Sequence, residues 1–207
     1  EGNAPWTPRE NHTAIVFNDG NNKIWIYGGK DEQTGYLNDV WSSTDGVNWT
    51  EESVGNSHWS TRANHQAIVH SGEVYVMGGK NNNSVNNEIW KSEDGHTFTQ
   101  VNASGHWAAR HGFAAVSYDD KLYVIAGQTD NNSLKKDIWS SSDGSNWTNH
   151  GDQAFSARKN FAALVFDAGR SSEIWVLGGE VEAAGPGNTV SNETWHGNFE
   201  DFSIKQL

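Results

Sequence analysis

The stretch NDVWSSTDGVNWT at Asn38–Thr50 decides the fold, because the chain repeats it twice more. The same order of residue types returns as NEIWKSEDGHTFT at Asn87–Thr99 and as KDIWSSSDGSNWT at Lys136–Thr148. The first Trp of each copy stands 49 residues before the next, and a fourth, Trp195, follows Trp139 after 56 residues. A period close to 50 residues indicates an array of similar structural units.

Two further markers recur with the same period. An arginine opens each unit, with spacings of 53, 48 and 48 residues, at Arg9, Arg62, Arg110 and Arg158. An apolar run ends on a glycine pair at Gly28–Gly29, Gly78–Gly79 and Gly178–Gly179, with Ala126–Gly127 in the third unit. The chain therefore contains four repeats.

The residue pattern of each repeat predicts β-strands. A short apolar run such as Ala14–Phe17 precedes a turn rich in Asn, Asp and Gly, and a β-branched and aromatic run such as Ile24–Tyr27 follows it. An Asp-Gly turn, Asp45–Gly46 in the first repeat, joins the third run to the fourth. No window shows the 3.6-residue apolar period of a helix. We predict an all-β fold, a β-propeller with four blades of four antiparallel strands. The predicted blades cover about residues 6–54, 55–103, 104–150 and 151–207 of a single domain, 1–207.

These residues resemble a known family. Arg-x-x-His, an apolar strand, IWIYGG at Ile24–Gly29, NDVW at Asn38–Trp41 and Asn48–Trp49 together resemble the kelch repeat, whose period is similar. The closing Ser-x-Asp-Gly-x-Asn-Trp-Thr most resembles kelch repeats of bacterial secreted or surface proteins, within the galactose-oxidase-like superfamily. The resemblance runs from Trp6 to about Ile204. It implies a kelch-type propeller whose loop-rich face docks partners.

Composition excludes several classes of protein. The 207 residues include 26 Asp or Glu but only 14 Lys or Arg, which gives a net charge of −12 and argues against nucleic-acid binding. No apolar run reaches the roughly 18 residues of a membrane-spanning helix. The absence of Cys excludes a disulfide, a thiolate metal site and a cysteine nucleophile. It also excludes the Cys-linked Tyr of a copper radical oxidase, and we expect no cofactor.

All 11 Trp occupy repeat positions, so we expect them to pack between strands and blades rather than to form a sugar-stacking platform. They are Trp6, Trp59 and Trp107 before the Arg, Trp25 and Trp175 in the second strand, Trp41, Trp90, Trp139 and Trp195 in the third, and Trp49 and Trp147 in the fourth.

The arginines favour two interpretations. One acid per repeat precedes the third-strand Trp, at Asp39, Glu88, Asp137 and Glu193. An ion pair with this acid, or bonds from the Arg to carbonyls of a neighbouring blade, would be structural. The alternative is a ring of four guanidinium groups that binds a carboxylate.

Two histidines and three Asp-Gly pairs are also repeat positions. His12 and His65 share a position with Phe113 and Phe161, which favours packing over catalysis. Asp45, Asp94 and Asp143 suit a capped turn better than a calcium site, because no loop with several spaced carboxylates occurs. We therefore predict no metal and no catalytic residue.

A binding site is expected where loops vary. In a four-strand blade the loop before the first strand and the loop between the second and third share one edge. The second set is variable and polar, at Lys30–Leu37, Lys80–Asn86, Gln128–Lys135 and Glu180–Ser191. The candidate ligand-binding residues of the first set are Arg9, His12, Arg62, His65, Arg110, His111, Arg158 and Lys159.

Three assemblies remain open: a closed four-blade ring, a half-ring that dimerises to eight blades, and part of a longer propeller. The fourth repeat is atypical, with a long insertion and no Asp-Gly pair after Trp195. A homo-oligomer, dimer or polymer, is therefore one expected partner state.

The chain begins at Glu1 without Met, so a signal peptide was removed or the chain is a fragment. The acidic, Cys-free, Asn- and Ser-rich composition favours an extracellular or cell-surface location. We expect a non-catalytic recognition module that binds a glycan or a protein. The alternatives are a self-assembling structural subunit and a kelch-like carbohydrate-active enzyme of the epimerase or lyase type.

Overall fold

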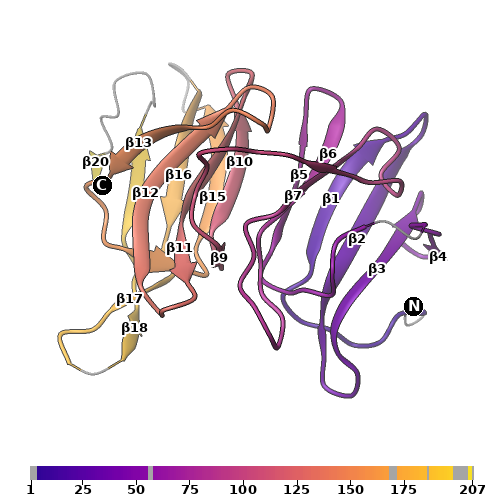
Figure 1. Ribbon diagram of the computed structural model, residues 1–207, viewed down its shortest axis with the longest axis horizontal. Helices are drawn as coiled ribbons and strands as arrows, with labels where there is room; N and C mark the ends of the chain where they lie inside the picture. Colours follow the sequence, from indigo (N-terminus) through magenta and orange to yellow (C-terminus); the bar gives the residue numbers. More distant parts are fainter. Residues whose placement is uncertain (1–3, 56–57, 168–171, 186, 198–204, 207) are drawn as a thin grey trace. The chain divides into compact units, whose positions relative to one another are not determined.

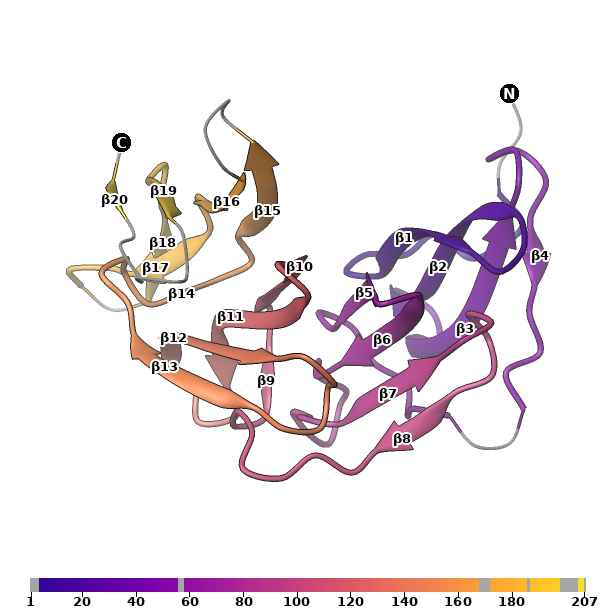
Figure 2. The same cartoon turned by 90° about the horizontal axis from the view of Figure 1, so that it is seen from above.

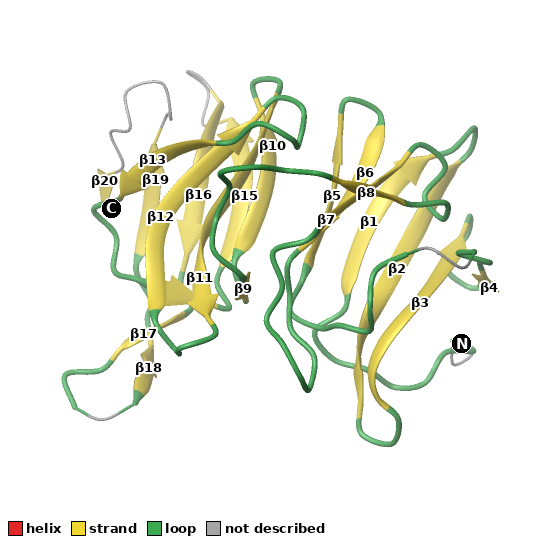
Figure 3. Ribbon diagram, in the orientation of Figure 1, coloured by secondary structure: helices red, strands yellow, loops and turns green. Residues whose placement is uncertain are grey.

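The computed structural model describes residues 4–55, 58–167, 172–185, 187–197 and 205–206. Those residues form strands and loops, with no helix among them (Figure 3). The chain divides into two compact units, Glu1–Asn102 and Ala103–Leu207, and the division falls at the expected boundary between the second and third repeats (Figure 1). That the whole chain forms one domain stays a prediction.

The first unit holds two four-stranded antiparallel sheets, each in chain order, which Figure 2 shows as two layers lying side by side. Blade 1 consists of β1 (Thr13–Asn18), β2 (Asn22–Asp31), β3 (Gly35–Ser43) and β4 (Thr50–Glu51). Blade 2 consists of β5 (Gln66–His70), β6 (Glu73–Met77), β7 (Ile89–Ser92) and β8 (Thr99–Val101).

The second unit repeats this arrangement with additions. Blade 3 consists of β10 (Ala114–Tyr118), β11 (Lys121–Thr129), β12 (Leu134–Ser141) and β13 (Thr148–Asp152), and β9 (Arg110–His111) pairs with β11. Blade 4 consists of β15 (Ala162–Asp167), β16 (Ser172–Leu177), β19 (Thr194–Gly197) and β20 (Lys205–Gln206). A small sheet joins β14 (Arg158–Lys159), β17 (Glu180–Glu182) and β18 (Asn188–Val190). The prediction of four blades of four antiparallel strands is confirmed.

Three predicted loops contain more strand than expected. In blade 3, β11 runs to Thr129 and β12 begins at Leu134, so both ends of the expected loop Gln128–Lys135 are strand. In blade 1, β2 runs to Asp31 and β3 begins at Gly35, so the expected loop Lys30–Leu37 is a tight hairpin. In blade 4, the expected loop Glu180–Ser191 contains the β17–β18 hairpin. These differences arise because polar residues at a strand end still form backbone ladder bonds when a partner strand lies beside them.

The glycine pair makes a β-bulge. The β2–β3 register shifts between Tyr27 and Gly29, and Gly28 has a left-handed φ of 50°. A Cβ atom on Gly29 would lie 2.8 Å from the Cβ of His12, closer than two such atoms approach, so only glycine fits there. At the first bulge position of blade 3, Ala126 adopts φ 53° with a side chain.

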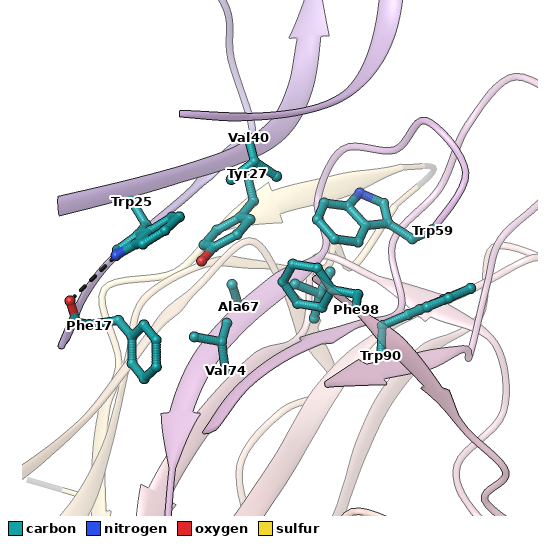
Figure 4. Close-up of a cluster of buried hydrophobic side chains, with 10 residues drawn as sticks. Phe17, Trp25, Tyr27, Val40, Trp59, Ala67, Val74, Trp90 and Phe98 are labelled. Atoms are coloured by element: carbon teal, nitrogen blue, oxygen red, sulfur yellow. Dashed lines mark hydrogen bonds between the residues drawn. The ribbon is translucent and has the colours of Figure 1, made fainter. Parts of the chain in front are cut away.

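Aromatic side chains fill the space between blades 1 and 2. Trp25 and Tyr27 of β2 are fully buried, and they face Ala67 and Val74 of blade 2 (Figure 4). The Tyr27 hydroxyl donates a hydrogen bond to the Gly95 carbonyl at 3.1 Å. Burial of such rings at about 150–250 Å² each supplies the apolar area that the modest aliphatic content lacks.

The same packing recurs between blades 3 and 4. Tyr123 and Ile125 of β11 are buried against Ile174 and Val176 of β16. The Tyr118 hydroxyl donates to a carbonyl of blade 4, that of Ser172, at 2.7 Å. Each unit is therefore a pair of blades with a hydrophobic core between them, which is mainly aromatic in the first unit and mainly aliphatic in the second.

The prediction that Trp residues pack is confirmed for the positions that lie deepest. Trp25, Trp59 and Trp107 are fully buried, and so is Phe155, which replaces Trp in the fourth repeat. Trp59 meets Phe98 edge to face with ring centroids 4.6 Å apart. Because no face of these indoles is open, none of the three can stack on a sugar ring.

Candidate functional site

The two loops of each blade share an edge, as predicted (Figure 1). An antiparallel bridge joins Glu10 to Lys30 in blade 1, and an equivalent bridge joins Ala63 to Lys80 in blade 2. In the second unit the short strands β9 and β14 make the same connection, to β11 and β17. We call the side of a blade that carries both loops its loop edge.

A repeated side-chain constellation supports the loop edge. In blade 1 the Arg9 guanidinium donates to both carboxylate oxygens of Asp39, at 2.6 and 2.8 Å, and the same carboxylate accepts from Trp41 Nε1 at 2.8 Å. The acid and the Trp are two residues apart on one strand, so both side chains lie on one face of the sheet. We call this constellation the Arg–acid–Trp triad.

All four blades contain the triad. Arg110 pairs with Asp137 at 2.7 and 2.9 Å, and Trp139 donates to Asp137 at 2.8 Å. In blades 2 and 4 a glutamate replaces the aspartate and bonds one guanidinium nitrogen. These triads are Arg62–Glu88–Trp90 and Arg158–Glu193–Trp195.

Each Arg also reaches the bulge of its own blade. Arg9 donates to the carbonyl of Gly28 at 3.0 Å, and Arg110 donates to the carbonyl of Ala126 at 2.8 Å. One interpretation of the sequence was that each Arg donates to carbonyls of a neighbouring blade, but these acceptors belong to the same blade as the Arg. The carbonyl of a left-handed residue points away from the neighbouring strand and loses its ladder hydrogen bond. The guanidinium donates a hydrogen bond to that carbonyl instead.

Burial of the triads identifies them as structural. The Arg side chains are 0–2 % exposed, and the predicted ion pair is confirmed in every blade. Burial alone would raise the pKa of Asp137, but the hydrogen bonds and charge of Arg110 lower it below the usual value. Burial lowers the pKa of Arg62, and its bond to Glu88 opposes that shift. A ligand-binding role for the four arginines stays a prediction.

The two histidines of the shared position differ in exposure. His65 is 2 % exposed, and both ring nitrogens lie buried without a hydrogen bond of normal geometry to the described residues. Burial lowers the pKa of His65 to about 3, and the charge of Arg62 adds to the shift. His12 is exposed, and its pKa is lowered by partial burial and by Arg9. The packing prediction is therefore confirmed for His65, which stays neutral at any physiological pH.

The remaining predicted residues lie on the short strands. His111 is 7 % exposed in β9. The Lys159 ammonium donates to Gln128 Oε1 at 2.9 Å and lies 3.5 Å from a carboxylate oxygen of Glu180. Of the eight candidates, only His12 on blade 1 presents a clearly exposed side chain at the loop edge.

Capped turns hold the loops between second and third strands. In blade 1 Asp31 accepts hydrogen bonds from the backbone of Gln33 at 2.8 Å and from the Thr34 hydroxyl at 2.5 Å. These bonds lower the pKa of Asp31 well below its usual range, the bond from the Thr34 hydroxyl most of all. In blade 2 Asn81 accepts from the backbone of Asn83 and Ser84 at 2.9 and 3.0 Å.

Asp31 was not predicted from the sequence, although the Asp-x-x-Thr spacing at Asp31–Thr34 is a signal of a side-chain-capped turn. The cap is buried while the loop tip beside it is exposed. Next to it lies an open depression of about 700 Å³, whose lining includes Glu10, Lys30 and Glu32. Turns that are already fixed, with exposed polar tips, can bind a partner with little loss of conformational entropy.

The Asp-Gly turns on the opposite edge are also capped. Asp45 Oδ1 accepts from the backbone of Val47 and Asn48 at 2.8 and 2.7 Å, and Asp143 does the same in blade 3. These carboxylates therefore cap the turns, which is the role that the sequence favoured over calcium binding. No cluster of three or more His, Cys, Asp or Glu side chains with metal-binding geometry occurs in the part of the chain that the structure describes.

That same part of the chain contains no helix long and apolar enough to cross a membrane. The model of the KLHDC2/KLHL20/DRC7 Kelch-repeats domain matches residues 1–179. No curated protein matches the chain.

Proposed function

The chain belongs to the kelch-repeat family, whose propeller domains mediate protein interactions, and on that premise we propose that it is a non-catalytic recognition module that binds through its loop edges. The contrast between scaffold and loops carries this proposal. The triads and bulges repeat from blade to blade, while the loops between second and third strands differ in sequence and range from seven residues in blade 2, through eight in blades 1 and 3, to twelve in blade 4. Variable loops on a constant scaffold are the usual place of binding function.

The exposed tips of the loops are polar, which suits a polar partner surface. Glu32 and Gln33 are exposed at the tip in blade 1, and Asn82 and Asn83 are exposed at the tip in blade 2. Short polar side chains with fixed turns satisfy the hydrogen-bonding groups of either a protein or a glycan. We favour a protein, because kelch propellers are protein-interaction modules.

The enzymatic alternative has less support. Each strongly shifted pKa among the described groups has a structural cause. Turn bonds lower those of Asp31, Asp45 and Asp143, and burial lowers that of His65. A general acid or base needs a pKa near the working pH and contact with a substrate.

We also propose an extracellular or cell-surface location, of the kind found for bacterial surface kelch proteins. Composition supports it, because the chain is acidic and rich in Asn and Ser. Cleavage of the chain by protease added to intact cells tests the location. Protection that ends only after lysis contradicts it.

Site-specific photo-crosslinking tests the recognition proposal. A photoreactive residue is placed at Gln33 or Asn83 on the loop edge, and at Asn21 or Lys121 on the opposite edge as controls; all four are exposed. We expect the same partner to be captured from both loop-edge positions and from neither control. Capture at the control positions alone contradicts the proposal. A glycan array with the intact chain separates the two partner classes, because glycan binding without protein capture favours the glycan.

Self-association, the other partner state expected from the four repeats, stays a prediction.

A further inference from the structure

The residue after each triad arginine begins a row of side chains across the loop edge. In blade 1 Glu10 pairs with Lys30 of β2, and Lys30 pairs on its other side with Tyr36 of β3, in the hairpin that joins the two strands (Figure 1). Residues directly opposite one another in an antiparallel pair point their side chains to the same face, so we call these three a cross-strand row. The other rows are Ala63, Lys80 and Val85 in blade 2, His111, Gln128 and Leu134 in blade 3, and Lys159, Glu180 and Val190 in blade 4.

The rows of blades 1 and 4 both carry a lysine opposite a glutamate, but only one of them forms an ion pair. In blade 4 the Lys159 ammonium lies 3.5 Å from a carboxylate oxygen of Glu180 and donates to Gln128 of blade 3 at 2.9 Å, so its charge is compensated within the second unit. In blade 1 neither Glu10 nor Lys30 forms an ion pair with any residue that the structure describes, although the two stand opposite each other.

The Lys30 ammonium leans away from Glu10. It lies 5.6 Å from the centroid of the Tyr36 ring, within the range of a cation–π contact. Because Tyr36 and Glu10 flank Lys30 on opposite sides, this contact holds the positive charge apart from the Glu10 carboxylate. Neighbouring strands lie about 4.8 Å apart, so the two ends of the row are about 10 Å apart. The row therefore presents a negative charge at one end and a positive charge toward the other.

These charges line the open depression of blade 1. Glu10, Lys30 and Glu32 all belong to its lining, and both glutamates are exposed. Glu32 also forms no ion pair with a described residue. The segment that leads into the row is tied to the turn at the tip, because the Thr7 hydroxyl donates to Asp31 Oδ2 at 3.0 Å. The depression is thus held in shape before a partner binds, which lowers the entropy lost on binding.

On the premise of the proposed function, we propose that this depression binds a peptide segment of a partner protein that carries an acidic and a basic side chain close together. The acidic side chain pairs with the Lys30 ammonium beside Tyr36, and the basic side chain pairs with Glu10 or Glu32. A separation of about 10 Å corresponds to about three residues of extended chain, at about 3.3 Å per residue. A nucleic acid supplies no cation for the glutamates, and a neutral glycan compensates none of the three charges, so a peptide is the complementary partner.

Selection from random peptides displayed on phage, with the full chain as bait, tests the proposal. We expect the enriched peptides to carry an acidic and a basic residue about three positions apart. Fluorescence anisotropy with the most enriched peptide then measures affinity. Lys30→Gln, and Glu10→Gln combined with Glu32→Gln, should each weaken binding by roughly tenfold or more. Lys121→Gln, which removes an exposed lysine on the opposite edge, is the matched control and should change the affinity by less than about twofold.

Charge reversal gives the decisive result. Lys30→Glu should lose the enriched peptide and bind a version of it in which lysine replaces the acidic residue. Enriched peptides without paired charges overturn the proposal, and so does an affinity that none of these substitutions changes while circular dichroism shows the variants folded.

A selection that enriches no peptide also overturns the proposal. If photo-crosslinking nevertheless captures one partner from both Gln33 and Asn83, the recognition function holds and only the peptide site is wrong. Capture at the control positions alone contradicts both.

Discussion

Replacing His65 by Phe should make the stability of the chain less sensitive to acid. His65 is fully enclosed, and burial together with the Arg62 charge lowers its pKa to about 3, against 6.5 in a model compound. The folded chain therefore binds no proton at this site between pH 7 and pH 4, whereas the unfolded chain does. Stability is lost as the pH falls through 6.5, and the loss continues until the pH reaches about 3.

The size of the effect follows from these two values. At pH 5 the unfolded histidine is almost fully protonated and the folded one almost fully neutral, so the site costs about 2 kcal/mol relative to pH 7. Phe113 and Phe161 already fill the same repeat position in blades 3 and 4, so the substitution suits the scaffold. It also removes two buried nitrogens without normal hydrogen bonds.

Urea unfolding at pH 7 and pH 5, followed by tryptophan fluorescence, measures the change. The wild type should lose about 2 kcal/mol more than His65→Phe between the two pH values. His12→Phe is the matched control, because this exposed histidine holds the same position in blade 1; it should keep most of the pH dependence. Equal pH dependence in the wild type and His65→Phe would refute the reasoning.

Three further substitutions test the scaffold by urea unfolding. Gly95→Ala should reduce the unfolding free energy by about 1–3 kcal/mol more than Gly46→Ala does. A Cβ atom at position 95 would lie 2.9 Å from the Trp25 ring, whereas a Cβ atom at position 46 would meet only one atom within 4 Å, at 3.7 Å. Equal costs would mean that the turn is not part of the blade junction. Ala126→Gly relieves a left-handed alanine but removes a fully buried methyl group and makes the unfolded chain more flexible, so the unfolding free energy should change by less than about 1 kcal/mol; a larger change would contradict this. Arg110→Lys should cost about 1–3 kcal/mol, because an ammonium cannot form the bidentate bond; an unchanged midpoint would show that the triad is not structural.

The repeat predicted the scaffold well, because each recurring residue performs the same local task in every blade. The spacing of Trp41, Trp90 and Trp139 predicted the sheets, and an acid two residues before each predicted the ion pair. The bond from each indole N–H to that acid was not predicted. It depends on the rotamers of two side chains on one sheet face, which spacing alone does not determine.

The candidate site was predicted less well, because exposure depends on the neighbouring blade. His12 and His65 are equivalent in sequence, yet only His65 is buried. A Cβ on Gly28 of blade 1 would lie 3.3 Å from the His65 ring, so that ring packs against the preceding blade. The two histidines were equal candidates from the repeat pattern, but only His12 is accessible at the loop edge.

The loops were located correctly but their internal structure was not predicted. The caps at Asp31 and Asn81 use residues that are common in any polar loop, so composition gave no reason to single them out. The hairpin of β17 and β18 was missed because its strands are three residues each, too short for an alternating pattern to be distinctive.

A variant that changes only loop tips tests the central claim most directly. Glu32→Ser, Gln33→Ser, Asn82→Ser and Asn83→Ser in one chain alter exposed tips and keep the caps Asp31 and Asn81. Affinity for the partner identified by crosslinking is then measured for the wild type and the variant, beside urea unfolding of both. Recognition by the loop edges predicts binding weakened by roughly tenfold or more, with the unfolding free energy within about 0.5 kcal/mol of the wild type. Undiminished binding by a variant of unchanged stability would contradict it.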